Sequence, residues 1–211
     1  MADWATISAL ATAGGTLVLA GATFASVRSA NRAARVAEQS LLASLRPLLI
    51  PSRLEDPQQK VNFVEGKTIV VPGGGGTAET GSGAVYLAVS LRNAGSGIAV
   101  LHGWHFWPER RLSRDEPLPL DRFTRLTRDL YIPVGDTGFW QGSFRDPSSP
   151  EFIAARHAIE NRQPVSVDIL YGDFEGGQRV VSRFVLLPRA DGDGWLAAIA
   201  RHWNIDRVEP R

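Results

Sequence analysis

The hydrophobic pattern of the chain begins with an uncharged run of 23 residues, Ala5 to Val27. An α-helix rises about 1.5 Å per residue, so this run spans roughly 34 Å, more than the ~30 Å hydrocarbon core of a bilayer. Residues 1–27 are therefore predicted to form a transmembrane helix with a short N-terminal tail. Two alternatives stay open: a buried helix of a soluble domain and a cleaved signal peptide. A signal peptide normally has positive residues ahead of its apolar core, whereas the only charged side chain that precedes this apolar run is Asp3.

Basic residues follow the apolar run and none precedes it. Arg28, Arg32, Arg35 and Arg46 all lie within about 20 residues of its end. The positive-inside rule then predicts that the N-terminus lies outside and that the chain after Val27 lies in the cytoplasm. The predicted location is the inner (plasma) membrane.

Residues 28–46 continue the helical pattern as a stalk with no Pro or Gly, and Pro47 ends it because a residue before proline favours extended geometry. Small and apolar side chains recur there at heptad a and d spacing. This seam either pairs two chains or packs against the chain's own domain. Small residues four apart in the apolar run, such as Ala11 and Gly15, would also allow self-association, although coding bias toward Ala and Gly explains them equally well.

From Pro47 onward the period becomes strand-like. One helix interrupts the strands, with Ser149 as its N-cap, Pro150 in the first turn and Asn161 near its end. Short turn-forming connections between the strands are typical of antiparallel hairpins. Residues 47–211 are therefore predicted to be a mainly β domain, an antiparallel two-sheet β-sandwich with one short helix. The expected strands are 47–55, 60–64, 67–71, 84–93, 98–107, 122–134, 138–144, 164–174, 179–189 and 194–205.

Strict alternation along two of these strands predicts which side chains share a face. In residues 194–205 the bulkier set is Trp195, Ile199 and Trp203, which we expect to face the core, with Arg201 escaping near an edge. In "LHGWHFW" the same rule places His102 with Trp104 and Phe106 and places Leu101 with Gly103, His105 and Trp107 on the opposite face.

Charge and composition remove several function classes. The net charge of +1 gives no support for a nucleic-acid partner, and the absence of Cys excludes disulfides, thiolate zinc sites and a Cys nucleophile. All but two of the 23 basic residues are arginines (the exceptions are Lys60 and Lys67), which hints at a high-GC bacterial genome.

The candidate ligand motifs favour ordinary structural roles. Gly73–Gly76 leads into a strand rather than a helix, so we expect a flexible inter-strand loop instead of a phosphate loop. Asp191–Gly194 lacks the distal Glu of a calcium loop, and no G-x-S-x-G is present. Asp173 and Glu175 sit beside glycines in a turn, and Asp168 reads as one polar residue on the outer face of a strand. No catalytic residue, metal or cofactor is expected.

One constellation stays open as an alternative. His105, His202, Asp168 and Trp195 lie on separate predicted strands, and their convergence would make an enzyme or small-ligand site. A deep pocket where they meet would favour this alternative, whereas a filled core with shallow grooves would favour a binding module. The aromatic side chains of "LHGWHFWPERR" are mainly expected to pack, with a binding patch as the second interpretation.

Several segments together resemble a diffuse group of uncharacterised bacterial membrane-anchored β-sandwich proteins. They are the apolar N-terminus, the Arg/Ala-rich helix closing on "LRPLL", and the motifs "LRNAGSGIA", "YGDFEGGQRVVSRF" and "GWLAAIARHW". The resemblance implies a transmembrane helix, a helical stalk and a β domain, and it brings no activity with it. The resulting hypothesis is a membrane-tethered, non-enzymatic β-sandwich that presents a cytoplasmic surface to a protein partner or to a second copy of itself.

Overall fold

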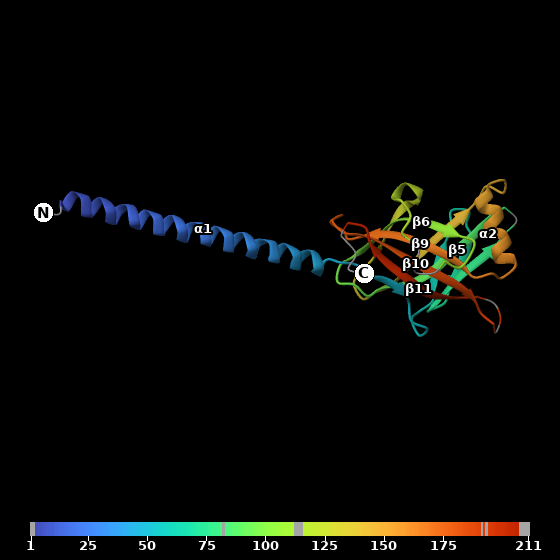
Figure 1. Ribbon diagram of the computed structural model, residues 1–211. Helices are drawn as coiled ribbons and strands as arrows, with labels where there is room; N and C mark the ends of the chain where they lie inside the picture. The colour runs from blue at the N-terminus through green and yellow to red at the C-terminus, as the bar shows by residue number, and fades with distance from the viewer. Residues whose placement is uncertain (1–2, 82, 112–115, 191, 193, 207–211) are drawn as a thin grey trace. The chain divides into compact units, whose positions relative to one another are not determined.

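The computed structural model describes residues 3–81, 83–111, 116–190, 192 and 194–206 (Figure 1). The chain divides into two compact units, Met1–Ala43 and Ser44–Arg211. The second unit confirms the mainly β class, because its strands form a curled antiparallel sheet whose two halves pack face to face as a sandwich.

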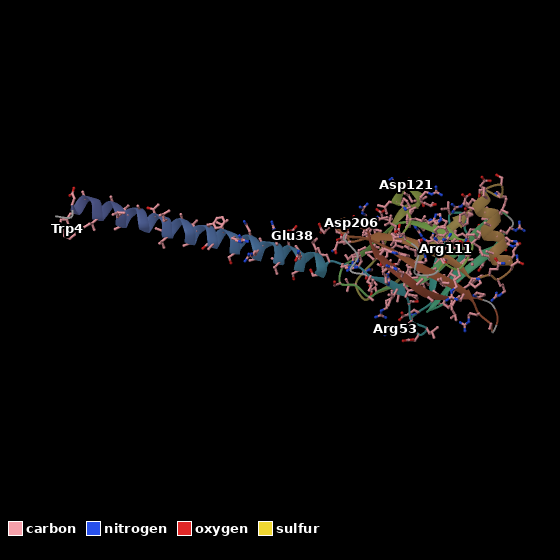
Figure 2. The ribbon with its side chains drawn as sticks, in the orientation of Figure 1. Trp4, Glu38, Arg53, Arg111, Asp121 and Asp206 are labelled. Atoms are coloured by element: carbon pink, nitrogen blue, oxygen red, sulfur yellow. The ribbon has the colours of Figure 1, made fainter. Side chains whose placement is uncertain are left out.

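The first unit contains the helix α1, Trp4–Ser44, except for its last residue. Its 41 residues correspond to a length of about 61 Å. The hydroxyl groups of Thr12, Thr16 and Thr23 each donate to the carbonyl four residues earlier, so these polar side chains are satisfied within the helix. Large apolar side chains along it are exposed, and Figure 2 shows them standing clear of the ribbon. By length and composition, Ile7–Leu42 is a candidate membrane span.

The large sheet has a simple neighbour order. It runs β1-β5-β4-β11-β10-β9-β6-β7, and β8 pairs with β5 on the edge opposite to β1 and β4. Strands β2 and β3 form a separate hairpin. The strands are β1 Leu49–Pro51, β2 Gln59–Asn62, β3 Thr68–Val71, β4 Gly75–Thr80, β5 Val85–Asn93, β6 Ala99–Trp107, β7 Thr124–Ile132, β8 Thr137–Phe144, β9 Val165–Gly172, β10 Arg179–Pro188 and β11 Trp195–Asn204.

The main core lies between the two halves of the sheet, and α2 (Pro150–Glu160) packs against it. As predicted, Ser149 caps α2, its hydroxyl accepting the Phe152 N–H at 3.1 Å. The β2–β3 hairpin covers the outer face of β5 through a second cluster that includes Val61, Phe63 and Ala88. A third cluster, beside the short 3-10 helix Leu120–Arg122, covers the outer face of β9, β10 and β11.

Two strand bulges change the alternation that the sequence predicts. On β11, Arg201 pairs with Arg183 whereas Ile199 pairs with Phe184, so Ala200 is an extra residue. Trp195 and Trp203 are both buried as expected, but they belong to clusters on opposite faces of the sheet, and Ile199 is exposed. On β6 the register shifts at His102, which places Leu101 in the core with Trp104 and Phe106. The two shared-face predictions are corrected accordingly.

The Gly73–Gly76 run is packed rather than a flexible loop, which corrects that expectation. Gly75 and Gly76 begin β4 and pair with β11, and Gly76 also pairs with Val89 of β5. A Cβ at Gly73 would lie 2.4 Å from the Arg53 carbonyl oxygen, and one at Gly76 would lie 2.4 Å from a Leu186 methyl carbon. Gly73 is therefore required by close approach of the backbone, and a side chain at Gly76 would force the buried Leu186 side chain to shift.

The segment after α1 is fastened to the β domain by the "RNAGSG" turn. Asn93 is fully buried, and its side-chain amide donates to the Gly97 and Ile132 carbonyls and accepts from Leu48 N–H at 3.2 Å. Ser96 N–H donates to the Arg46 carbonyl at 2.9 Å. A Cβ at Gly97 would lie only 1.7 Å from the Leu45 carbonyl oxygen, which accounts for glycine at that position.

Candidate functional site

The four residues of the alternative site occupy three separate places. His105 and Asp168 are neighbours in register across β6 and β9, on the outer face of the sheet. His202 pairs in register with Ser182, on the face where Tyr171 joins the main core. Trp195 lies in the main core at the far end of β11. The structure therefore brings two of the four together.

Asp168 forms a buried ion pair with Arg183. Arg183 Nε donates to Asp168 Oδ1 at 2.7 Å and Arg183 Nη2 donates to Asp168 Oδ2 at 2.8 Å, so the pairing is bidentate. Trp107 Nε1 adds a third donor at 3.0 Å. Asp168 is 0% exposed and Arg183 is 1% exposed. This corrects the interpretation of Asp168 as a single polar residue on a strand's outer face, because on that face it is buried and paired. A carboxylate held by three donors and shielded from solvent is placed for a structural role.

Arginine and tryptophan side chains alternate around this pair. The Arg111 guanidinium carbon lies 4.0 Å from the centre of the Trp107 ring, and that of Arg201 lies 5.6 Å from Trp203. Between them, Arg183 lies 5.7 Å from Trp107 and 5.0 Å from Trp203. Cations over indole faces are attracted by the ring quadrupole, more strongly where water is excluded. We call these five side chains the Arg–Trp ladder.

His105 packs against the ladder at its β6 end. Its ring centre lies 4.6 Å from that of Trp107, and its Nδ1 lies 3.3 Å from the Arg122 carbonyl oxygen. Partial burial lowers the pKa of His105 below its ordinary value, against the opposing effects of that carbonyl and of Asp168. The neutral ring is thus favoured, as expected of a packing histidine.

Ser182 and His202 resemble a nucleophile and its base only in their separation, since Ser182 Oγ lies 2.6 Å from His202 Nδ1. Ser182 is fully buried, and its oxygen also contacts the Tyr171 hydroxyl at 2.8 Å. Leu49 N–H in turn donates to Tyr171. Burial raises the pKa of Tyr171 to about 12, so its hydroxyl stays protonated. The chain of polar atoms ties β1 to the sheet and leaves no open path to the serine.

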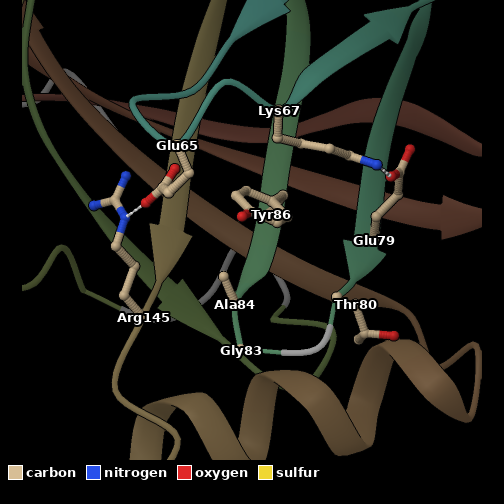
Figure 3. Close-up of a pocket in the computed structure, with 9 residues that line it drawn as sticks. Glu65, Lys67, Glu79, Thr80, Gly83, Ala84, Tyr86 and Arg145 are labelled. Atoms are coloured by element: carbon tan, nitrogen blue, oxygen red, sulfur yellow. Dashed lines mark hydrogen bonds and ion pairs between the residues drawn. The ribbon is translucent and has the colours of Figure 1, made fainter.

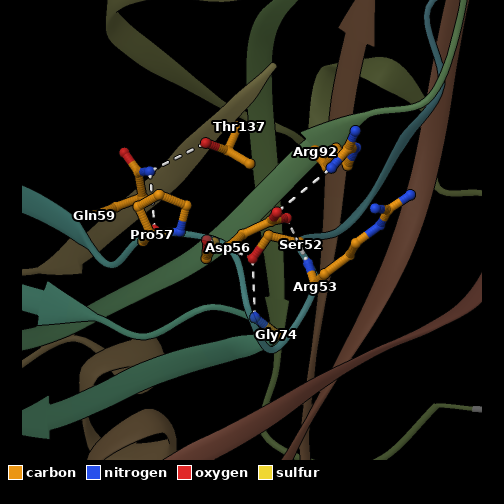
Figure 4. A network of polar contacts seen from close by, with 9 residues as sticks. Ser52, Arg53, Asp56, Pro57, Gln59, Gly74, Arg92 and Thr137 are labelled. Carbon is orange, nitrogen blue, oxygen red and sulfur yellow. Dashed lines mark hydrogen bonds and ion pairs between the residues drawn. The ribbon is translucent and has the colours of Figure 1, made fainter. Parts of the chain in front are cut away.

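A polar network around Asp56 fixes the loop that leads into β2 (Figure 4). Asp56 accepts the Arg53 N–H at 2.7 Å and lies 3.5 Å from Arg92 Nη1. Ser52 Oγ accepts the Gly74 N–H at 2.9 Å. These contacts hold the glycine run against the domain. Asp191 and Asp193 lie outside the described residues, and within the described residues no three His, Asp or Glu side chains gather to hold a metal ion.

One groove, which we call the paired-charge groove, has a volume of about 480 Å³ (Figure 3). Lys67 Nζ lies 2.8 Å from Glu79 Oε2 on one side, and Glu65 pairs with Arg145 on the other. Tyr86 lies between the two pairs in Figure 3. Pairing lowers the pKa of Glu65 and raises that of Lys67. All four charged side chains are substantially exposed, so this groove is open to solvent rather than an enclosed chamber.

A smaller groove, which we call the β7–β8 groove, has a volume of about 110 Å³. Leu126, Leu130 and Trp104 supply apolar lining, and Arg125, Arg128 and Arg145 supply its charge. Among the described residues that line it, none is Asp or Glu. Arg145 borders both grooves, and the sequence pattern predicts neither of them. The only sequence signal is the excess of Arg over acidic residues in 122–128.

No protein-family model, curated protein or solved structure matches this chain.

Proposed function

We propose that this chain is a single-pass inner-membrane protein whose β domain is a non-enzymatic module that binds a protein partner on the cytoplasmic side. The observation that carries the proposal is α1, whose long apolar stretch keeps its large side chains exposed, joined in sequence to a domain with its own filled core. Exposed leucines along a helix are favourable in lipid and unfavourable in water.

The surface of the domain supports binding over catalysis. An enzyme or ligand receptor would need His105, Asp168, His202 and Trp195 to converge, but only His105 and Asp168 are neighbours. Asp168 is also saturated by its donors. The grooves are instead rimmed by exposed charged side chains. Such a rim suits recognition of another macromolecule.

The proposed orientation rests on Arg28, Arg32 and Arg35, which follow the apolar run directly. No Lys or Arg precedes the run, so the positive-inside rule predicts that these arginines and the β domain after them lie in the cytoplasm. The membrane-anchored β-sandwich group that the sequence resembles has the same proposed layout.

Membrane fractionation after expression in a bacterium tests the anchor. The full chain should sediment with membranes and resist carbonate extraction, and a chain beginning at Ser44 should be soluble. Leu17→Arg with Leu19→Arg should release the full chain, because each Arg near the centre of a span costs about 2.5–3.5 kcal/mol on the insertion scale. Val36→Arg, a matched change outside the uncharged run, should leave it membrane-bound. Full chain in the soluble fraction would overturn the proposal.

A further inference from the structure

The sandwich is open along one side. Strand β7 pairs only with β6, and β8 pairs only with β5, so within the described chain each has one edge that joins no other strand. Strand edges of this kind present backbone N–H and C=O groups that another extended chain can pair with. Of the two, β8 is the better template, because its register with β5 is unbroken from Thr137 to Phe144 whereas β7 has a register shift against β6.

The β7–β8 groove beside these edges is the wrong size for a small-molecule site. Ligand pockets for drug-sized molecules occupy roughly 300–1,000 Å³, and this groove has about 110 Å³. Its floor includes Trp104, which is buried and stacks edge-on against Phe144 with ring centres 5.3 Å apart. Such a depression accommodates one or two apolar side chains of a peptide whose backbone follows the strand.

The charge of the β7–β8 groove selects the kind of peptide. Arg125 and Arg128 are exposed on β7, and Arg145 follows β8. Arg128 Nη2 donates a hydrogen bond to Gln141 Oε1 at 3.2 Å. Because this acceptor is neutral, a carboxylate would compete with it successfully for the Arg128 guanidinium. With no Asp or Glu among its described lining residues, the groove complements negative side chains.

Glu65, which lines the neighbouring paired-charge groove, shows how an acidic side chain pairs with Arg145. It lies in the turn of the β2–β3 hairpin and pairs with Arg145, the residue that borders both grooves. Both side chains are more than one-third exposed, and exposed ion pairs of this kind contribute little to stability. A carboxylate from another chain can therefore replace Glu65 at Arg145 without a large energetic penalty.

We propose that the β7–β8 groove binds an extended acidic peptide segment of a partner protein, which adds to the free edge of β8, and that Glu65 competes with it for Arg145. The apolar side chains of the peptide enter the depression over Trp104 while its carboxylates meet Arg125, Arg128 and Arg145. This inference rests on the proposed function as a protein-binding module and names the chemistry of its partner.

The test is peptide binding by the full chain in detergent micelles, followed by fluorescence anisotropy. The probe is a nine-residue labelled peptide that alternates valine with glutamate, and the comparison peptide replaces each glutamate with glutamine. We expect saturable binding of the first peptide that weakens with salt, and binding of the second that is weaker by about tenfold or more. N-methylation of alternate backbone amides on the β8-facing side should abolish binding, because it removes the donors for strand addition.

Variants separate the roles of the side chains. Arg125→Gln with Arg128→Gln should weaken binding by about tenfold or more, whereas Arg156→Gln, on the exposed face of α2, should leave it unchanged. Glu65→Gln should tighten binding, because the competitor for Arg145 loses its charge. Circular dichroism would verify that each variant is folded.

Two results would overturn this inference: no saturable binding of the glutamate peptide, or equal binding by the Arg125/Arg128 variant and the unchanged chain. Either result in a chain that still fractionates with membranes would remove the peptide site and leave the membrane-tethered layout standing. A chain that binds the peptide but is not membrane-bound would contradict the anchor alone.

Discussion

Asp168 and Arg183 form an ion pair on the outer face of the sheet, where other side chains bury it. Their attraction and their three hydrogen bonds offset a desolvation cost of several kcal/mol per ion, so the pair is finely balanced. Removing one partner destroys that balance, because the other charge stays buried without compensation.

We therefore expect Asp168→Asn to lower the free energy of unfolding of residues 44–211 by about 3–5 kcal/mol. Urea unfolding followed by tryptophan fluorescence would measure the loss. Glu160→Gln, which removes an exposed ion pair with Arg156 on α2, is the control and should cost less than about 0.5 kcal/mol. A loss below about 1 kcal/mol for Asp168→Asn would show that Arg183 finds another counter-charge or water.

The sequence pattern does not predict this ion pair, because alternation along β9 alone does not reveal it and the register of the β9–β10 hairpin comes from the structure. Gly172 and Arg179 pair across the β9–β10 turn, and the same hairpin register brings Asp168 opposite Arg183. Only with that register known do an acid and a base at matching positions of a hairpin, each among apolar residues, predict a cross-strand ion pair. Sequence alone does not show the burial of that pair, because the side chains that cover it, such as Trp107 and Trp203, come from distant strands.

Two partly buried histidines predict a pH dependence. Desolvation lowers the pKa of His102 and of His105 below the ordinary 6.5, outweighing the opposing charges of Asp129 and Asp173 at the first and Asp168 at the second. Arg179 near His102, and Arg122 and Arg183 near His105, lower the pKa further. Below a pH of about 6.5 the unfolded chain thus binds protons that the folded domain resists, and stability falls.

The melting temperature of residues 44–211 should therefore decline as the pH falls from about 7 to about 5.5, before most carboxylates titrate. A variant with His102→Gln and His105→Gln should show a flatter profile over that interval. Thermal unfolding by circular dichroism at fixed ionic strength measures both. Identical slopes for the two proteins would assign the pH dependence to other groups.

Among the elements, the existence of a strand is easier to predict than the direction its side chains face. The positions of β5 through β11 follow closely from alternation and turn residues, and α2 follows from its Ser149 cap. The sequence pattern does not predict β4, because a strand that begins with two glycines lacks β-propensity and is defined by neighbours on both sides. The bulges at His102 and Ala200 leave no mark in the local pattern, so alternation assigns the side chains beyond them to the wrong face.

The bulge at Ala200 makes Trp203 part of the outer cluster with Phe123, Leu170 and Val181. We expect Trp203→Ala to destabilise residues 44–211 by about 3–5 kcal/mol, since it removes a buried aromatic side chain and one ring of the Arg–Trp ladder. Leu196→Ala, on the same strand but 39% exposed, should cost clearly less. Urea unfolding would compare them, and a Trp203→Ala loss no larger than that of Leu196→Ala would place Trp203 in solvent.

In the molecule as a whole, the two units follow from two different kinds of pattern. A long uncharged run followed by arginines predicts the helix, and it extends without interruption from Trp4 to Ser44. Alternation with short turns predicts the β domain, which the sheet confirms. Sequence patterns do not predict the two grooves. Each groove forms where the edges of the curled sheet and the β2–β3 hairpin come together, and these segments are too far apart in the sequence for a local motif to show their contact.

The proposed layout requires that a single helix fixes the chain in the inner membrane with its β domain in the cytoplasm. Protease treatment of intact spheroplasts that express the full chain tests this directly, with antibody detection of the β domain and a periplasmic protein as the control for digestion. We predict that the domain survives in intact spheroplasts and is digested once they are permeabilised. Digestion of the domain in intact spheroplasts, while a cytoplasmic marker survives, would contradict the proposed topology.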